Sequence, residues 1–310
     1  MNDAAPIAGP TAAARASLRL QRTDLALYGA TVFVWGTSWI AIRAQLGTVA
    51  PEVSVLWRFA LAAPLMLAFA AWRGERLAGY SGADHARFAG TGVLLFCANF
   101  VLFYHGGLTI PSGLLAVVFS LASVLNLVLG ALILGNRVEP RVAAGGVVGF
   151  AGIGLLFWPQ IAGAGFDHAA LVGLGFCVAG TLSFCLGNML TSVIQRRGVP
   201  VMASTAWGMV YGVAALLALC LAQGHAFAFE WTPRYVAGLV YLATGASVVA
   251  FGCYLTLLKR IGAARAAYAT VLFPLVALAI STAVEGYRWT VFSVIGAALA
   301  LLGNVLVLRR

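Results

Sequence analysis

The stretch Gly113–Leu134 reads GLLAVVFSLASVLNLVLGALIL and contains no charged residue. The stretch Val142–Trp158 follows it closely and is also uncharged. An α-helix rises about 1.5 Å per residue, so about 20 apolar residues span the hydrocarbon core of a bilayer. These two stretches therefore predict helices that cross a membrane.

The composition extends this prediction to the whole chain. Of 310 residues, 62% are hydrophobic and 9% are charged, whereas a soluble domain carries about 25% charged residues. The net charge of +10 could indicate nucleic acid, but the positive residues fall in short loops, so we expect no nucleic-acid partner. The five cysteines lie inside apolar runs without a CxxC pair, so we expect no disulfide framework, metal site or cofactor.

Ten apolar runs separated by short loops predict an all-α membrane protein with ten transmembrane helices. Residues 1–24 precede them and lack the apolar core of a signal peptide, so they are interpreted as a flexible cytoplasmic tail. The runs are about 25–44, 52–72, 86–107, 112–134, 141–159, 169–195, 200–222, 234–258, 263–284 and 289–308.

The distribution of Lys and Arg predicts the orientation. One side of this arrangement holds Arg43, Arg58, Arg234 and Arg288, and the other side holds the rest of the 19 Lys and Arg residues. Positive residues are retained in the cytoplasm, so both termini are predicted to be cytoplasmic. The cytoplasmic set is Arg15, Arg19, Arg22, Arg73, Arg76, Arg87, Arg137, Arg141, Arg196, Arg197, Lys259, Arg260, Arg265, Arg309 and Arg310.

The two halves align at one offset of 149 residues, the separation of Pro51 from Pro200 and of Trp35 from Phe184. This offset predicts two five-helix repeats, 25–159 and 169–308. Because five is odd, the second repeat must enter the membrane in the opposite sense. Inverted repeats are the construction of many secondary transporters, in which two related packings give alternating access.

Several segments also resemble a known family. Trp35–Ala41 (WGTSWIA) and Trp57–Pro64 (WRFALAAP) look like the start of an EamA domain. Ala269–Pro274 (ATVLFP), Glu285–Trp289 (EGYRW) and Gly303-Asn304 look like the end of a second one. The resemblance implies the drug/metabolite transporter superfamily and a bacterial inner-membrane exporter similar to aromatic amino-acid exporters. Asn136 departs from the glutamate that the family commonly carries there.

The acidic residues all lie in tails, loops or helix ends. Coupled carriers often use a carboxylate in mid-membrane, so we expect no ion coupling through such a residue. The chain has no GxxxxGK[ST] motif for ATP binding. Of the four histidines only His105 lies well inside a predicted span, which disfavours an intramembrane enzyme.

Arg58 is the clearest charge inside a predicted span. It lies seven residues past Pro51, about 10 Å into the second helix at about 1.5 Å per residue. One interpretation is that it binds a substrate carboxylate. The alternative is a structural clamp on backbone carbonyls or on Glu52.

Further candidates for substrate binding are deep aromatic and polar side chains. They could line a cavity, or they could serve helix packing through interhelical hydrogen bonds. A second set of smaller polar residues is interpreted mainly as packing contacts: Ser120, Ser123, Asn126, Thr181, Ser183, Asn188 and Thr270. The candidate set is Trp35, Asn99, Tyr104, His105, Trp207, Ser247, Tyr254 and Tyr268.

Pro64 and Pro274 interrupt the second and ninth helices and are hinge candidates, with a static kink as the alternative. The whole pattern predicts a secondary transporter of amino acids or similar small amphipathic metabolites. A drug or nucleotide-sugar carrier of the same superfamily is one alternative, and a pore or channel is another. A monomer is plausible, and the expected partners are a small-molecule substrate and the lipid bilayer.

Overall fold

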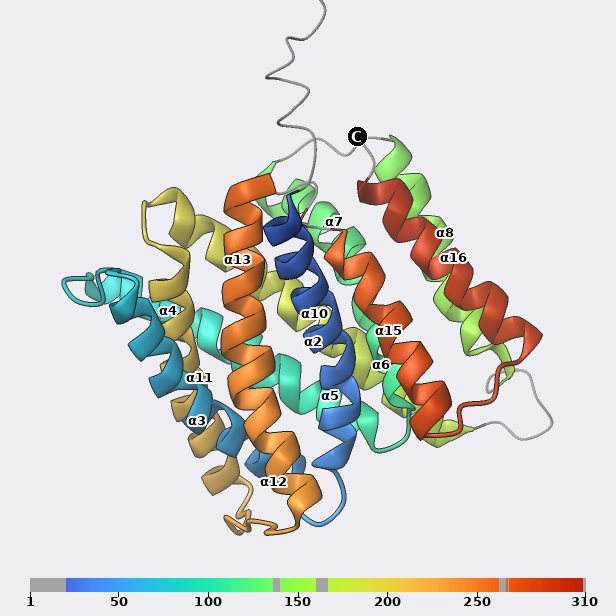
Figure 1. The fold of residues 1–310 in the computed structure, drawn as a ribbon, viewed down its shortest axis with the longest axis horizontal. Helices are drawn as coiled ribbons and strands as arrows, with labels where there is room; N and C mark the ends of the chain where they lie inside the picture. The colour runs from blue at the N-terminus through green and yellow to red at the C-terminus, as the bar shows by residue number, and fades with distance from the viewer. Residues whose placement is uncertain (1–20, 136–139, 160–166, 262–265, 267, 309–310) are drawn as a thin grey trace, which may run out of the picture.

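The computed structural model describes residues 21–135, 140–159, 167–261, 266 and 268–308. Every regular element in those ranges is a helix (Figure 1), which confirms the all-α prediction. Most of the predicted tail, residues 1–20, and Asn136 lie outside the described residues.

The helices of the first half follow the predicted runs closely. A longer span in the third position is built from α4, η1 and α5, which run on without a break. The elements are α2 (Arg22–Ala44), α3 (Pro51–Trp72), α4 (Gly82–Thr91), the π-helix η1 (Gly92–Ala98), α5 (Asn99–Gly107), α6 (Ser112–Ser120), α7 (Ala122–Leu134) and α8 (Pro140–Leu156).

The second half repeats this order. The eighth helix of the chain, like the third, contains a π-helix between two α-helical segments. The elements are α10 (His168–Arg196), α11 (Val201–Ala222), α12 (Pro233–Val240), the π-helix η2 (Tyr241–Val249), α13 (Ala250–Ile261), α15 (Ala269–Val284) and α16 (Val291–Leu308).

Local sequence explains where these helices begin and end. Pro51 occupies the first turn of α3, where its missing N–H is not needed. The Ser81 hydroxyl accepts from Asp84 N at 3.2 Å, and Asp84 reaches back to Ser81 N, forming a capping box for α4. Gly135 ends α7 with φ +69°, a left-handed conformation that glycine adopts readily.

Seven helices are long and apolar enough to cross a membrane among the described residues, beginning with Arg22–Ala44 and ending with Pro233–Leu257. Three shorter apolar helices accompany them, Ala143–Leu156, Ala269–Val284 and Val291–Val307. Each of the ten predicted runs overlaps one of these helices, of which seven have the length and hydropathy of a membrane span. The chain is therefore a multi-pass membrane protein.

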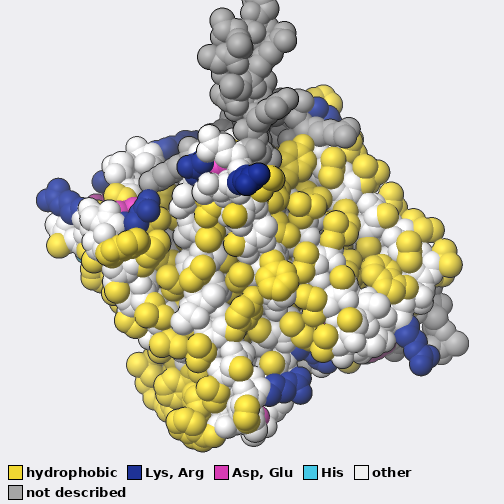
Figure 2. All heavy atoms as spheres, in the orientation of Figure 1, with side chains coloured by type: hydrophobic (Ala, Val, Ile, Leu, Met, Phe, Trp, Pro, Cys, Tyr) yellow, Lys and Arg dark blue, Asp and Glu magenta, His cyan; other side chains and the backbone are white. Residues whose placement is uncertain are grey.

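Charged residues are confined to the two ends of the bundle on the face shown in Figure 2, where the middle is covered by hydrophobic and neutral side chains. The beginning of α2 and the end of α16 lie at the same end of the bundle (Figure 1). This face thus has an uncharged belt, as expected of a surface that faces lipid.

Two features recur at equivalent places in the two halves. The π-helices begin at Gly92 and Tyr241, which are again 149 positions apart. The helix partnerships also recur. The first helix of the second half, α10, packs on α5 and α7 of the first half, and the first helix of the first half, α2, packs on α13 and α15 of the second half.

The pair α8 and α16 lies at one side of the bundle (Figure 1) and packs mainly on itself. Glycines bring the two backbones together. A Cβ on Gly152 would lie 2.7 Å from Gly296 O, and one on Gly303 would lie 2.5 Å from Gly145 O. Small residues at such an interface allow close helix packing in a membrane.

Candidate functional site

A cavity of about 550 Å³ lies between the first four helical positions of each half. Side chains from α2, α3, η1, α5, α6 and α7 meet others from α10, α11, η2, α13 and α15 around it. Among the described residues, the lining contains none from α8, α12 or α16. The α8 and α16 pair therefore lies outside the site.

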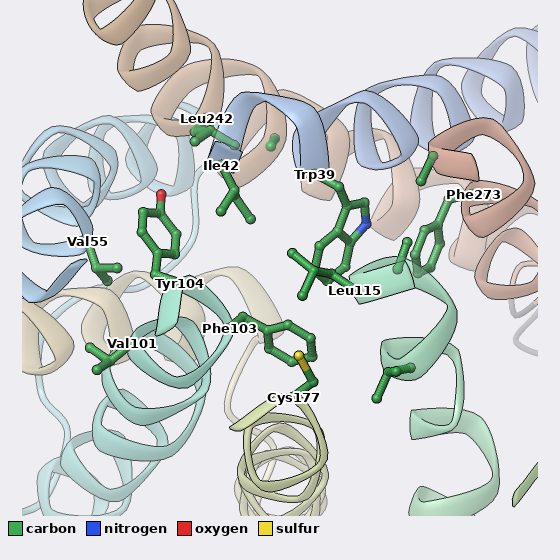
Figure 3. Close-up of a cluster of buried hydrophobic side chains, with 14 of the residues drawn as sticks. Trp39, Ile42, Val55, Val101, Phe103, Tyr104, Leu115, Cys177, Leu242 and Phe273 are labelled. Atoms are coloured by element: carbon green, nitrogen blue, oxygen red, sulfur yellow. The ribbon is translucent and has the colours of Figure 1, made fainter. Parts of the chain in front are cut away.

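Aromatic side chains form a large part of the cavity wall, beside small polar side chains. Trp39 is central among them, with ring centroids 5.2 Å from Phe103 and 5.6 Å from Phe119. Figure 3 shows its indole between Phe103 and Phe273. The aromatic lining is Trp35, Trp39, Phe59, Phe96, Phe100, Phe103, Phe119, Phe184, Phe251, Tyr254 and Phe273.

Arg58 lines this cavity from α3 and is only 4% exposed. Its Nε and Nη2 atoms donate to Ser247 Oγ at 3.4 and 3.3 Å. Its guanidinium lies over the Phe100 ring at 4.3 Å and near the Phe59 ring at 5.3 Å, so cation–π attraction helps to hold it. Neither of the clamp partners expected from sequence, a backbone carbonyl or Glu52, holds it by a described hydrogen bond.

Ser247 faces Arg58 because of the π-helix η2. Its hydroxyl donates to Leu242 O, five residues earlier, at 2.9 Å, which is the π-helical spacing. In the opposite repeat, Asn99 follows η1 and donates from Nδ2 to Leu95 O at 3.3 Å. Its Oδ1 is buried without a hydrogen-bond partner among the described residues. The two π-helices thus bring polar groups to one cavity.

Trp35 and Tyr254 form a second part of the lining. Their ring centroids are 5.1 Å apart at an interplanar angle of 44°. The Trp35 indole N–H donates to Ala246 O at 3.3 Å, so its ring is fixed and its polar edge is satisfied. The structure therefore brings five predicted residues together around the cavity: Trp35, Arg58, Asn99, Ser247 and Tyr254.

Two predicted residues on α5 lie outside the lining. Tyr104 is fully buried and donates from its hydroxyl to Gln45 Oε1 at 2.6 Å. His105 Nε2 lies 2.7 Å from Glu52 Oε1, and its ring stacks on Phe176. Both residues join the end of α5 to the ends of α2 and α3. Their observed contacts are structural.

The remaining two predicted residues are also placed away from the cavity. The Trp207 indole donates to Leu77 O at 2.9 Å, and its ring contacts His85. In the other half, Trp57 donates to Ala228 O at 3.0 Å. Each tryptophan thus fastens the second helix of its half to a loop of the opposite half. Tyr268 is the N-cap residue of α15 and is not among the lining residues.

Sequence reasoning missed several lining residues. Trp39 could have been found, because it lies one helical turn from Trp35 on the same face. Asn126 and Asn188 were assigned mainly to packing. They are bonded to each other at 3.3 Å across α7 and α10, and they also line the cavity. Ser120, Ser123 and Thr270 line it as well.

The cavity approaches one end of the bundle. Its lining reaches Gln195 and Val201, which flank the α10–α11 turn. At the opposite end, polar contacts join the helix ends. Arg43 forms an ion pair with Glu285 at 3.0 Å and donates to Gly107 O. The Ser112 backbone N–H also donates to Glu285, at 3.0 Å.

Comparison with known proteins places this geometry in context. The EamA-like transporter family matches residues 24–158 and 171–309. An Escherichia coli (strain K12) protein named "Probable amino-acid metabolite efflux pump" is 28% identical over 94% of this chain and 97% of its own length. An "Uncharacterized inner membrane transporter YedA" from the same strain is 26% identical over 90% of this chain and 91% of its length. A crystal structure with 18% identity and a TM-score of 0.65 covers 93% of this chain and 96% of its own, which shows the shared fold.

Proposed function

The chain belongs to the EamA-like transporter family and is a membrane transporter of metabolites, and we propose that it is a secondary exporter or exchanger of amino acids or similar small amphipathic metabolites. The observation that carries this proposal is the cavity between the two halves, whose lining combines aromatic rings with polar side chains. An amphipathic solute could place its apolar body against the rings and its polar group near Arg58. The family assignment excludes an enzyme and leaves the direction of transport to experiment.

The proposed membrane arrangement is ten spans in two inverted repeats, with both termini in the cytoplasm of a bacterial inner membrane. The recurrence of the π-helices at Gly92 and Tyr241 supports the repeats. The matching contacts of α10 with α5 and α7, and of α2 with α13 and α15, support the repeats independently. An even number of spans agrees with α2 beginning and α16 ending at the same end of the bundle.

Alternating access is the proposed mechanism. The lining reaches the α10–α11 turn, which the charge distribution assigns to the cytoplasm, while Arg43, Glu285 and Gly107 close the opposite end. A cavity closed at one end favours a carrier over an open pore. The two helix-to-loop hydrogen bonds, Trp57 to Ala228 and Trp207 to Leu77, are similar contacts in the two halves. Pro64 and Pro274, which lie inside α3 and α15, stay the proposed hinges.

The proposed binding residues are Trp35, Arg58, Asn99, Ser247 and Tyr254, the predicted residues that line the cavity. The same lining has no Asp or Glu among the described residues. A carrier that binds protons or Na⁺ through a carboxylate in its cavity would need one. We therefore propose transport without ion coupling of that kind, by exchange or down a substrate gradient.

Counterflow tests the proposal. Purified protein is reconstituted into liposomes loaded with one unlabelled amino acid, and uptake of the labelled compound is followed without an ion gradient. Transient accumulation above equilibrium is expected for a carrier, and protein-free liposomes give the background. Flux that rises linearly with concentration, without counterflow, would show a pore. No saturable flux with any amino acid or related metabolite, from folded protein, would refute the proposal.

A further inference from the structure

The cavity contains a charge without a counter-charge. Arg58 is the one charged residue of the lining among the described residues, and its Nη1 is buried without a hydrogen-bond partner there. A buried cation is costly unless it is paired. The Ser247 hydroxyl and the Phe100 ring stabilise the guanidinium, but both are neutral groups.

The nearby carboxylate is already engaged elsewhere. Glu52 lies on the same helix as Arg58, but its two oxygens contact His105 at 2.7 Å and His225 at 3.4 Å. The Tyr104 hydroxyl donates to Gln45 and its oxygen also interacts with Arg58, but it is a neutral group and supplies no counter-charge. Neither Glu52 nor Tyr104 belongs to the lining. The missing counter-charge would therefore be supplied by a bound anion, for which an unpartnered guanidinium N–H is a strong donor.

The rest of the lining determines what kind of anion fits. A volume of about 550 Å³ walled by aromatic rings suits one aromatic or bulky apolar body. The unpartnered Asn99 Oδ1 can accept from a neutral N–H or O–H group. A free ammonium group would find no carboxylate among the described lining residues. Ring faces attract an ammonium more weakly, and Arg58 repels it.

We propose that the cavity prefers a monocarboxylate with an aromatic or bulky apolar body and no free ammonium group, and that Arg58 Nη1 binds the carboxylate. This inference rests on the proposed function and narrows its substrate class from amino acids to their unaminated or N-acylated relatives. The selection is electrostatic, because the site offers a positive charge to one end of the ligand and neutral groups to the other.

A ligand series on one phenyl body tests the preference. Phenylpropionate and N-acetylphenylalanine are anions, phenylalanine is a zwitterion, and phenylalaninamide is a cation. Binding to the purified full chain is measured by quenching of tryptophan fluorescence, since Trp35 and Trp39 line the cavity. We expect the two anions to bind at least about 10-fold more tightly than phenylalanine, as for one charge-assisted interaction, and phenylalaninamide to bind least.

Variants locate the effect at Arg58. Arg58→Gln should weaken binding of both anions by about 10- to 100-fold and should not weaken binding of phenylalaninamide. Arg58→Lys should keep the order of the ligands. Arg234→Gln is the matched control, because it removes an exposed arginine outside the cavity. If Arg58→Gln does not fold, the order of ligand affinities in the wild-type protein and in Arg58→Lys tests the inference instead.

The outcomes separate this inference from the proposed function. Equal binding of phenylalanine and phenylpropionate, or unchanged anion affinity in folded Arg58→Gln protein, would overturn the inference. Counterflow with phenylalanine would then still support an amino-acid carrier. Conversely, a clear preference for anions in binding, with no counterflow of any ligand in the series, would support the inference and count against transport of this class.

Discussion

The glycine contact between α8 and α16 gives a sharp stability prediction. A Cβ on Gly152 would lie 2.5 Å from Ala300 N, 2.7 Å from Gly296 O and 3.0 Å from Leu299 C. Non-bonded carbon atoms prefer a separation of about 3.5–4.0 Å. Gly152→Ala therefore requires the two helices to move apart by about 1 Å, and such overpacking costs about 1–3 kcal/mol.

Gly154 provides the matched control on the same helix. A Cβ there would meet nothing within 4 Å. Both substitutions share the gain in helix propensity, about 1 kcal/mol relative to glycine, so that gain cancels between them. We expect Gly152→Ala to be less stable than Gly154→Ala by about 1–3 kcal/mol.

The assay is reversible unfolding in mixed micelles titrated with dodecyl sulfate, which yields the free energy of unfolding for each variant. Because α8 and α16 contribute nothing to the cavity lining among the described residues, ligand affinity of the folded variants should be unchanged. A second substitution, Gly296→Ala, acts on the same contact and should add less than its separate effect. Equal stability of Gly152→Ala and Gly154→Ala would refute the reasoning.

Two other predictions separate binding from structure. Trp35→Ala should weaken binding of any aromatic ligand by about 10-fold. Trp207→Ala should instead lower the free energy of unfolding without changing ligand affinity, because the Trp207 indole binds Leu77 O outside the cavity. Fluorescence titration and unfolding of both variants check this, and a loss of affinity in folded Trp207→Ala alone would contradict it. Tyr104→Phe should lower the free energy of unfolding by about 1–3 kcal/mol, because it removes the hydroxyl that donates to the buried Gln45 Oε1 at 2.6 Å. The unfolding assay used for Gly152→Ala tests this, and a variant as stable as wild type would show that the bond contributes nothing.

Hydropathy predicted the helices well because the membrane imposes a simple rule. A span needs about 20 apolar residues, and the runs at 52–72 and 200–222 match α3 (Pro51–Trp72) and α11 (Val201–Ala222) almost residue for residue. The all-helical architecture followed from the same pattern, whereas the transporter family followed from the resemblance of segments such as Trp57–Pro64 to an EamA domain. The count of ten spans and the orientation stay predictions, as do the roles of the site residues.

The site was harder to predict, because sequence position does not determine tertiary direction. Arg58 and Trp207 occupy equivalent places in the two repeats, yet Arg58 lines the cavity and Trp207 binds the Leu77 carbonyl in a loop. That difference depends on how residues 73–81 fold back against α11. Asn99 and Ser247 were predicted as polar residues of symmetry-related spans, and Ser247 also from its α-helical spacing to Tyr254. Their direction depends on the π-helices, which the periodicity of the sequence did not indicate.

The two π-helices also bear on how this chain tolerates insertions and deletions. A π-helical turn holds one residue more than the α-helical turn it replaces. Removing one residue from Gly92–Ala98 or Tyr241–Val249 would restore a plain α-helix and keep the span continuous. The segments before and after that point would keep their rotational phase, because the turn stays complete with one residue fewer. In a plain α-helix the same deletion would rotate everything beyond it by about 100°, whereas here it would change the cavity wall locally, at groups such as Asn99, while the bundle stays intact.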